Sequence, residues 1–367
     1  MRRRLWIIIL AALALFAGCE RRPLENMYST TVKVVVKCLW TVEAYPDGIK
    51  PSGVTMYFFR NGEFHSTLTT ANVDSCTVQL PEGHYRMYMI SQSPEEYWKM
   101  EFDHMTSFTD ASMSLRRSNV TWATRVGDEE VVENPEVIYA GVSDEFDITS
   151  KMAEDYQYYY SNLKKLMSSG RNTKAGDDDE ITFYEEKVEY YTVRIPVYPK
   201  NVVSQLWITI FSDNADVLKS VRASTSGMAR TFELTQGVTN KDEAIQVLSD
   251  WKLTMDDPVR RVGHVDGIIT TFGLPNGEVP SAVRDSSLNV SALLVDDTTV
   301  ANYKFNVGDK IRILPPNEGY RSLYRLVFGS VSEPAIKPPD VKPSGGGGGF
   351  TAAVSDWEDE IETEILL

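Results

Sequence analysis

A strict alternation of apolar and polar side chains near the start of the chain limits the structures that it can adopt. Between residues 31 and 43, Lys33, Lys37, Thr41 and Glu43 are separated by apolar side chains at every second position. The apolar set consists of Val32, Val34, Val36, Cys38, Trp40 and Val42. A period of two places successive side chains on opposite faces of an extended backbone, so we expect one long, half-buried strand here.

The segments that follow predict more short strands separated by turns. Residues 54–59 are strongly apolar, Asn61-Gly62 is a typical hairpin turn, and residues 76–80 alternate again before Pro81-Glu82-Gly83. Later runs of the same kind are residues 193–197, 206–210, 268–272, 288–295, 303–307 and 323–328. The first two flank Pro199-Lys200-Asn201 and predict a hairpin. Because no helices alternate with these strands, the sequence favours an antiparallel β-sandwich over a parallel α/β sheet.

One segment has a helical period instead. Apolar side chains recur three and four residues apart from Met152 to Met167, and Ser168-Ser169-Gly170 ends the pattern. We therefore expect one short helical insertion in a mainly β protein. Residues 171–180 are expected to form a polar loop.

Length and composition set the scale of the domains. A chain of 367 residues, 42% of them hydrophobic, is large enough for about two domains with cores of their own. We place an N-terminal β-sandwich domain at residues 31–180 and a C-terminal one at residues 181–343. A Gly linker and a C-terminal strand are expected at residues 344–367.

The N-terminus has the layout of a secretory signal peptide. A cationic start and an apolar run ending at Phe16 precede Ala17-Gly18-Cys19. We expect residues 1–18 to be removed and the mostly polar residues 19–30 to form a tether. The apolar run is also short for a permanent membrane-spanning helix.

The charge balance excludes nucleic acid as a partner. The chain has 37 Lys and Arg residues against 52 Asp and Glu residues, which gives a formal net charge of −15. Binding to phosphates needs clustered Lys and Arg, and the sequence has no such cluster.

Motifs of the common enzyme classes are missing from the sequence. The four histidines have no partner at zinc-ligand spacing, and there is no nucleophile elbow, phosphate-binding loop or dinucleotide fingerprint. The carboxylate pairs Asp256-Asp257 and Asp296-Asp297 fall in expected turns. Solvated Asp residues are common in turns without any catalytic role. We therefore expect no enzyme, no catalytic or metal-binding residues and no cofactor. A glycosidase with two distant carboxylates would leave no signal of this kind.

Two further clusters allow a functional interpretation and a structural one. The acidic run 177–180 could bind Ca²⁺, but it lacks the spaced ligand order of a calcium loop, which favours a solvated loop. The tyrosines at positions 156 and 158–160 could form a carbohydrate platform. Because Met152 and Leu163 share their helical stripe, core packing is the stronger interpretation.

Cys38 and Cys76 are the two cysteines that remain besides Cys19. Each lies on the apolar face of its predicted strand, and an exported protein can form disulfides. A bridge between them requires Cα atoms within about 7 Å. Two separate buried thiols fit the pattern as well, since cysteine behaves as a small hydrophobic residue.

The C-terminal tail combines a flexible linker with an alternating segment. Five glycines, residues 345–349, form the flexible linker. In the alternating segment after them, one face of the extended chain carries glutamates at 358, 360, 362 and 364. The other face carries Trp357, Ile361, Thr363, Ile365 and Leu367. A strand needs a partner for its backbone groups. The tail is therefore a candidate donor strand for another subunit, or equally an edge strand of this protein's own sheet.

Several short motifs along the chain are structural in character. The first is Ala17-Gly18-Cys19, which resembles a bacterial lipobox, although Phe16 stands where Leu is usual. The others are Cys38-Leu39-Trp40, Leu80-Pro81-x-Gly83-x-Tyr85, Ser226-Gly227-Met228-Ala229, and the Gly-rich segment followed by Val354-x-Asp356-Trp357. None of these motifs is catalytic. Together they resemble the motifs of the fimbrillin superfamily, and within it those of the fimbrillin-associated anchor lipoproteins and their uncharacterised relatives.

The resemblance implies two tandem transthyretin-like β-sandwich domains, exported as a lipoprotein and assembled into type V pili by strand exchange. It also implies that Cys19 carries acyl chains such as palmitate and holds the protein in the outer membrane, at the cell surface. Stalk subunits of this family lose their first strand to an Arg-specific protease. Here Arg21 and Arg22 precede the first strand, and no arginine lies between Thr31 and Pro51, which favours an anchor or base role.

Two functions of different classes follow. The first is a structural, anchor or accessory component of fimbriae, which works through strand complementation and has fimbrial subunits as partners. The second is a surface lipoprotein that binds glycan or protein in an adhesion or nutrient-uptake system, without a pilus. A β-sandwich is compatible with both.

Overall fold

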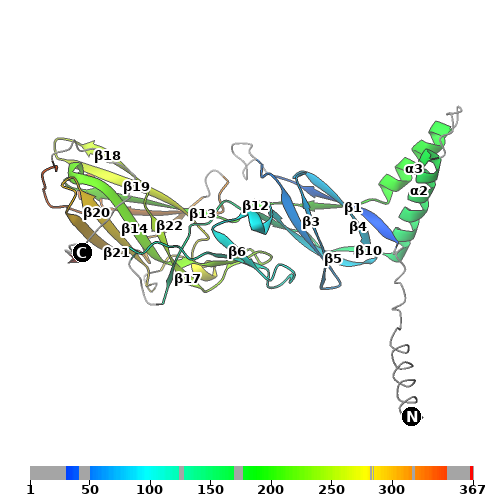
Figure 1. Ribbon diagram of the computed structural model, residues 1–367, viewed down its shortest axis with the longest axis horizontal. Coiled ribbons are helices and arrows are strands. Elements are labelled where there is room, and N and C mark those ends of the chain that lie inside the picture. The colour runs from blue at the N-terminus through cyan, green and yellow to red at the C-terminus, as the bar shows by residue number, and fades with distance from the viewer. Residues whose placement is uncertain are drawn as a thin grey trace, which may run out of the picture. The chain divides into compact units, whose positions relative to one another are not determined.

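The computed structural model describes residues 30–40, 50–123, 128–168, 177–281, 283, 285–315, 319–344 and 364–366. In this part of the chain, strands predominate and two α-helices pack side by side (Figure 1). Most neighbouring strands are antiparallel, so the predicted mainly β fold with several antiparallel sheets is confirmed. The predicted signal peptide and Cys19 lie outside the described residues.

Two sheets contain the strands of the first 100 residues. The smaller one consists of β1 (Thr31–Cys38), β4 (Ser75–Pro81) and β11 (Val193–Val197), in the order β11-β1-β4. The larger one consists of β2 (Val54–Arg60), β3 (Glu63–Thr70), β5 (Gly83–Ser91), β9 (Tyr139–Val142), β10 (Phe146–Ile148) and β12 (Lys200–Asn201). Its order is β12-β9-β5-β2-β3, and β10 pairs with β5.

Two larger sheets contain most strands of the second half. One consists of β13 (Ser204–Ser212), β18 (Trp251–Asp257), β19 (Val262–Thr271), β22 (Arg312–Leu314) and β23 (Leu323–Phe328), in the order β18-β19-β13-β23-β22. The other consists of β8 (Glu130–Val132), β14 (Leu218–Ala229), β17 (Glu243–Leu248), β20 (Ser287–Leu294), β21 (Val300–Asn306) and β24 (Glu364–Leu366). Its order is β24-β21-β20-β14-β17-β8.

A fifth sheet joins strands from both halves of the chain. It consists of β6 (Met100–Asp103), β7 (Ser112–Leu115), β15 (Thr231–Glu233) and β16 (Val238–Thr239), in the order β16-β15-β7-β6. Short 3₁₀ helices cover residues Pro94–Glu96, Ala215–Val217 and Pro275–Gly277. The pairings of β13 with β23, β17 with β8, and β21 with β24 are parallel.

The alternating pattern of the first strand is confirmed. Val32, Val34, Val36 and Cys38 are buried, and Lys37 is exposed. The strand ends at Cys38, earlier than the alternation suggests, and Val42 lies outside the described residues. Trp40 lies beyond the strand, where its indole Nε1 donates a hydrogen bond of 2.8 Å to the carbonyl oxygen of Val73.

The predicted Asn61-Gly62 turn joins β2 to β3. Asn61 has φ 52° and Gly62 has φ 87°, so both central residues are left-handed, which matches the twist of a two-residue hairpin. Arg60 pairs with Glu63 across this turn. Local sequence therefore determines the register of this hairpin.

The two large sheets of the second half form a β-sandwich. Alternate residues of β13 are buried throughout its length, and they pack with apolar residues of β14, β20 and β21 from the facing sheet. The cluster includes Leu206, Ile208, Val221, Val290 and Tyr303. Because the buried side chains come from both inner faces, the two sheets pack against each other as layers.

A second core fills the space between the β2–β5 face and the fifth sheet. Tyr57 and Tyr88 stack with ring centroids 4.8 Å apart, and Phe59 contacts Phe108 at 5.4 Å. Met113 and Phe232, from β7 and β15, belong to the same buried cluster. Strands from distant parts of the chain therefore share one core.

The Ser226-Gly227-Met228-Ala229 motif forms a β-bulge. The pairing of β14 with β17 shifts between Thr225 and Met228, and Gly227 has φ 72°. A bulge inserts one extra residue into a strand, and its left-handed position favours glycine.

The helix predicted between residues 152 and 167 is present as α2 (Ser150–Ser168), but the expectation of one helix and a following loop was wrong. The structure has a second helix, α3 (Asp177–Tyr190), which begins at the acidic run. Acidic side chains in a first turn stabilise a helix through its dipole, so the run favours a helix start as well as a loop. Tyr159 of α2 stacks on Tyr191, just beyond α3, with ring centroids 5.4 Å apart.

The predicted hairpin around Pro199-Lys200-Asn201 was also wrong, although both of its strands exist. β11 pairs with β1, and β13 pairs with β19 and β23. Lys200 and Asn201 form a strand of their own, β12, which pairs with β9. The three segments thus join three different neighbours, a choice that depends on distant residues.

The described contacts divide the chain into two compact units. The first comprises Met1–Val34, Gln79–Gly83 and Ile148–Val193, and the second comprises Val35–Val78, His84–Asp147 and Arg194–Leu367. Within the second unit, β7 and β8 pair with β15 and β17. The domain boundary near residue 180 stays a prediction.

Phe58 tests the packing around β2. It is fully buried, and Thr67 on the neighbouring strand β3 is exposed. We expect Phe58→Ala to lower the free energy of unfolding by about 3 to 5 kcal/mol, because it removes a large side chain from a packed core. Thr67→Ala should cost under about 0.5 kcal/mol. Urea titrations of both variants measure this difference, and equal midpoints would contradict the burial of β2.

Candidate functional site

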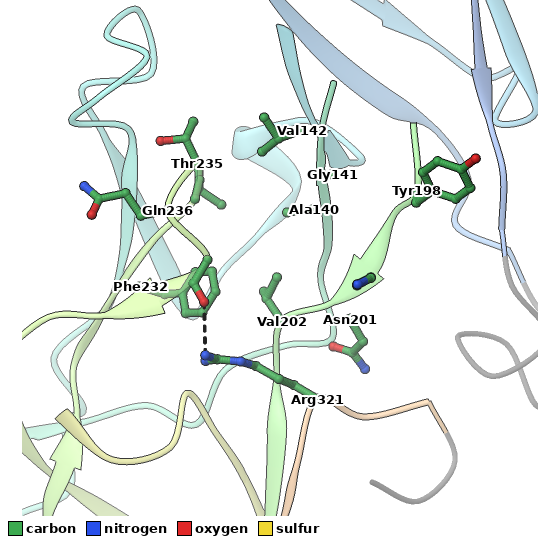
Figure 2. Close-up of a pocket in the computed structure, with 13 residues that line it drawn as sticks. Ala140, Gly141, Val142, Tyr198, Asn201, Val202, Phe232, Thr235, Gln236 and Arg321 are labelled. Atoms are coloured by element: carbon green, nitrogen blue, oxygen red, sulfur yellow. Dashed lines mark hydrogen bonds between the residues drawn. The ribbon is translucent and has the colours of Figure 1, made fainter. Parts of the chain in front are cut away.

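A cavity of about 350 Å³ lies between the strand pair β9–β12 and the turn that joins β15 to β16 (Figure 2). Its thirteen lining residues come from four separate segments of the chain. They are Ala140, Gly141, Val142, Tyr198, Lys200, Asn201, Val202, Phe232, Leu234, Thr235, Gln236, Gly237 and Arg321. This volume is at the lower end of the range of small-molecule pockets.

The first wall is the short pairing of β12 with β9. Lys200 lies opposite Ala140 and Asn201 opposite Tyr139. The side-chain Oδ1 of Asn201 accepts a hydrogen bond of 2.9 Å from the backbone N–H of Val203, which fixes the end of the strand. At Gly141 a Cβ atom would lie 2.7 Å from the Cγ1 of Val197, so the close approach of this wall requires glycine.

The second wall is the turn between β15 and β16. The Gly237 N–H donates to the carbonyl oxygen of Glu233 at 2.9 Å, and Gly237 has φ 70°, which favours glycine. The Thr235 hydroxyl donates to the Phe108 carbonyl oxygen at 2.6 Å, and the Gln236 side-chain amide donates to that of Thr109 at 3.4 Å. The wall is therefore anchored to the loop before β7.

Arg321 reaches from the segment before β23 toward the second wall (Figure 2). Its backbone N–H donates to the Val203 carbonyl oxygen at 2.8 Å, and its Nη2 donates to the Gly237 carbonyl oxygen at 3.0 Å. The guanidinium carbon lies 4.9 Å from the centroid of the Phe232 ring. Burial lowers the pKa of Arg321 from its usual value, and the neighbouring Tyr324 opposes this shift.

The cavity is cationic, although the chain as a whole is acidic. Arg321 and Lys200 line it, and none of its lining residues is Asp or Glu. Within the described residues, neither cation forms an ion pair with a carboxylate. The walls therefore offer hydrogen-bond donors and positive charge to an anionic group.

A second, larger cavity of about 630 Å³ lies on the β22–β23 pair. It is lined by Asp309, Lys310, Arg312, Leu314, Arg325 and Val327. Arg312 and Arg325 are directly opposite each other in the β22–β23 pairing, and both are exposed. This cavity is cationic as well, and it contains one carboxylate.

The two cysteines predicted as a possible disulfide are buried, free thiols in the structure. The Cys38 sulfur lies 3.8 Å from the sulfur of Met89, and the Cys76 sulfur lies 2.9 Å from that of Met56. Burial raises the pKa of Cys38 to about 12 and that of Cys76 to about 11. Both therefore stay protonated at neutral pH and have little nucleophilic character.

Of the candidate donor strand, the structure describes Glu364–Leu366 as β24. This strand lies parallel to β21, and Ile365 is opposite Tyr303. Trp357, Ile361 and Thr363 lie outside the described residues, as Cys19 does.

Of the tyrosines of α2, which were interpreted as either core residues or a carbohydrate platform, some are buried and others are exposed. Tyr156 is 1% exposed and belongs to the core, whereas Tyr158 is 60% exposed. Asp296 accepts backbone hydrogen bonds in a turn, as expected. Asp256 and Asp257 are instead the last residues of β18, and Asp257 accepts backbone hydrogen bonds from the turn that follows. In the part of the chain that the structure describes, no cluster of three or more His, Cys, Asp and Glu side chains is arranged to hold a metal ion. None of the described helices has the length and apolar character that crossing a membrane requires.

Sequence reasoning did not find the cavity of Arg321. Its residues come from four segments spread between positions 140 and 321, and no spacing links Arg321 to Lys200 or Phe232. The one local signal is Gly237 in a polar Thr-Gln-Gly turn, which predicts a turn and says nothing of a ligand.

Comparison with known proteins gives one matching family and several solved structures of similar fold. The model of a family described as a domain of unknown function (DUF5119) matches residues 18–250. A search of curated proteins found no match. The solved structure of a "putative adhesin" from Bacteroides ovatus is similar with a TM-score of 0.51 and 14% identity, and the match covers 89% of this chain and 99% of that one.

Two fimbrial proteins from Porphyromonas gingivalis are more distant. The anchor protein Mfa2 has a TM-score of 0.44 and 11% identity, over 81% of this chain and 90% of that one. The tip protein Mfa3, with C-terminal truncation, has a TM-score of 0.32 and 9% identity, over 80% and 94%. The match to the Bacteroides ovatus structure shows a shared fold over most of this chain.

The raised pKa values of Cys38 and Cys76 give a prediction about thiol reactivity. In a Cys19→Ala variant, neither thiol should react with a thiol reagent at pH 8 until urea unfolds the protein. Because burial raises both pKa values above 9.0, the folded state favours the protonated thiols. The free energy of unfolding should therefore be constant with respect to these groups below pH 9 and fall as the pH rises toward 11 and 12. Rapid labelling of the folded protein at pH 8 would contradict this account.

Proposed function

The chain belongs to the DUF5119 family of domains of unknown function, and on this premise we propose that it is a fimbria-associated or adhesin-like protein of the cell surface. Its role would be structural, as an anchor or accessory component, and would involve no catalysis. The observation that carries the proposal is the shared fold with the "putative adhesin" from Bacteroides ovatus, which extends over 89% of this chain and 99% of that one.

Attachment to the membrane would come from acylation of Cys19. The cationic start, the apolar run and Ala17-Gly18 before Cys19 support this step. With a net charge of −15, the protein gains nothing from contact with anionic lipid, so the acyl chains would provide the attachment. The eleven residues from Glu20 to Thr30 would span at most about 36 to 40 Å between lipid and the first strand.

Assembly with fimbrial subunits would use the C-terminal tail as a donor strand. The alternation of glutamates with Ile361, Thr363 and Ile365 suits a strand with one apolar face, and the five glycines before it allow different positions. In the structure its last residues, β24, form the edge strand beside β21. Among the residues of the tail that the structure describes, three pair there, and exchange of these three for another sheet edge would cost few hydrogen bonds.

Retention of the first strand fits an anchor better than a stalk subunit. Arg21 and Arg22 precede β1, and β1 itself contains no arginine. Cleavage after Arg22 would release the lipid and leave β1 in its sheet. The alternative function, a surface module that binds glycan or protein without a pilus, is favoured by the cavity of Arg321.

Lipidation is tested by Cys19→Ser. Without the thiol no acyl chain can be attached, so the variant should move from the membrane fraction to the soluble fraction or accumulate as the uncleaved precursor. Fractionation followed by immunoblotting measures this change, with Cys38→Ser as the matched control that keeps the membrane position. Equal fractionation of wild type and Cys19→Ser would rule out the lipoprotein.

Strand donation is tested by deleting residues 350–367. If the tail completes a neighbouring subunit, the variant should stay folded and in the membrane but no longer co-purify with fimbrial subunits. A control with Glu360→Gln and Glu362→Gln keeps the apolar face and should keep its partners. If the tail only completes this protein's own sheet, the deletion should leave the partners unchanged and lower the melting temperature by several degrees, as about 1 kcal/mol shifts a domain of this size by about 2 to 4 °C.

A further inference from the structure

We propose that the cavity of Arg321 binds the carboxylate of an acidic sugar unit, such as a hexuronate or a sialate. The cavity joins a guanidinium group with a free edge, a second cation and two side-chain amides in a volume of about 350 Å³. The inference goes beyond the proposed fimbrial role and does not depend on strand donation.

The guanidinium group of Arg321 is oriented for a planar anion. Phe232 lies against it at 4.9 Å, and the Gly237 carbonyl oxygen accepts one of its Nη2 hydrogens at 3.0 Å. These two contacts hold the group in place and use one of its five N–H groups. Its remaining edge can donate two parallel hydrogen bonds to a carboxylate, the geometry that arginine favours.

The charge of the cavity suits an anionic ligand. Lys200 lies on the opposite wall and supplies the second cation, and no lining residue is a carboxylate that would compete. The cavity has no helix N-terminus and no glycine-rich nest among its lining segments, which are the usual elements of phosphate sites. The arrangement therefore favours a carboxylate over a phosphate group.

The remaining lining groups favour a sugar over a peptide. Asn201 and Gln236 line the cavity from opposite walls. Beyond the hydrogen bonds that they make to Val203 and Thr109, their side-chain amides have further donors and acceptors that match ring hydroxyls. One recurring mode of peptide binding adds a strand to a free sheet edge, but the edge strand here, β12, is only two residues long. A saccharide-sized ligand needs no such edge.

Calorimetric titration of the full-length protein with N-acetylneuraminate and glucuronate tests the proposal. At least one of the two should bind, whereas glucose and N-acetylglucosamine should not. Arg321→Gln should weaken binding about 10- to 100-fold, because it removes charged hydrogen bonds. Arg321→Lys should also weaken it, since a lysine keeps the charge but loses the planar fork. Lys200→Gln should weaken binding by a smaller factor.

Matched control variants distinguish binding in this cavity from binding in the second cationic cavity and from a loss of folding. Arg325→Gln removes one charge from the second cationic cavity and should leave the affinity unchanged. The melting temperature of each variant shows whether it is folded, and the exposed Lys200 provides a substitution that leaves the Phe232 contact intact.

Four results would overturn the proposal. The first is that neither acidic sugar binds the wild type. The second is that binding is unchanged in both Arg321→Gln and Lys200→Gln. The third is a loss of affinity in Arg325→Gln alone, which would assign the ligand to the second cavity. The fourth is that a glutamate-containing peptide binds at Arg321 and the acidic sugars do not, which would make the cavity a contact for protein carboxylates.

Discussion

Backbone pairing between strands from the two halves of the sequence is the interaction on which the rest of the second compact unit depends. β7 and β8 complete sheets with β15 and β17, and β9 pairs with β12. Buried N–H and C=O groups need partners, so none of these short strands is stable alone. The same pairings bring Phe232 into one core with Tyr88 and place the turn after β15 opposite Lys200. The core and the cavity thus follow from one set of hydrogen bonds.

Local patterns predicted most of the strands but few of their neighbours. The alternation of Val32, Val34 and Val36 and the Asn61-Gly62 turn are short-range signals, and the structure confirms both. α3 was missed because its side chains are mostly exposed or half-buried, which leaves little helical period in the sequence. The pairing of β11, β12 and β13 with three different partners depends on residues far along the chain, and no local pattern contains that information.

The candidate site was beyond sequence reasoning for the same reason. Arg321 and Gly237 are 84 positions apart, yet one hydrogen bond joins them. Burial of Arg321 against Phe232 gives it a fixed orientation, whereas most cations of this acidic protein lie on its surface. For Cys38 and Cys76, in contrast, the sequence contains a local pattern, but that pattern is ambiguous. Their sequence pattern allowed either a bridge or two separate buried thiols, and the structure has them as buried, free thiols with raised pKa values.

We propose that this β-sandwich protein lies at the cell surface, joins fimbriae through strand edges and carries a separate small cavity for an anionic ligand. The central claim is the association with fimbriae, because the fold alone is shared by proteins of different function. Mass spectrometry of surface appendages purified from the native cell tests it most directly. We expect this protein to be found with the fimbrial subunits in those preparations. Fimbriae free of the protein, with all of it in the remaining membrane, would contradict the claim.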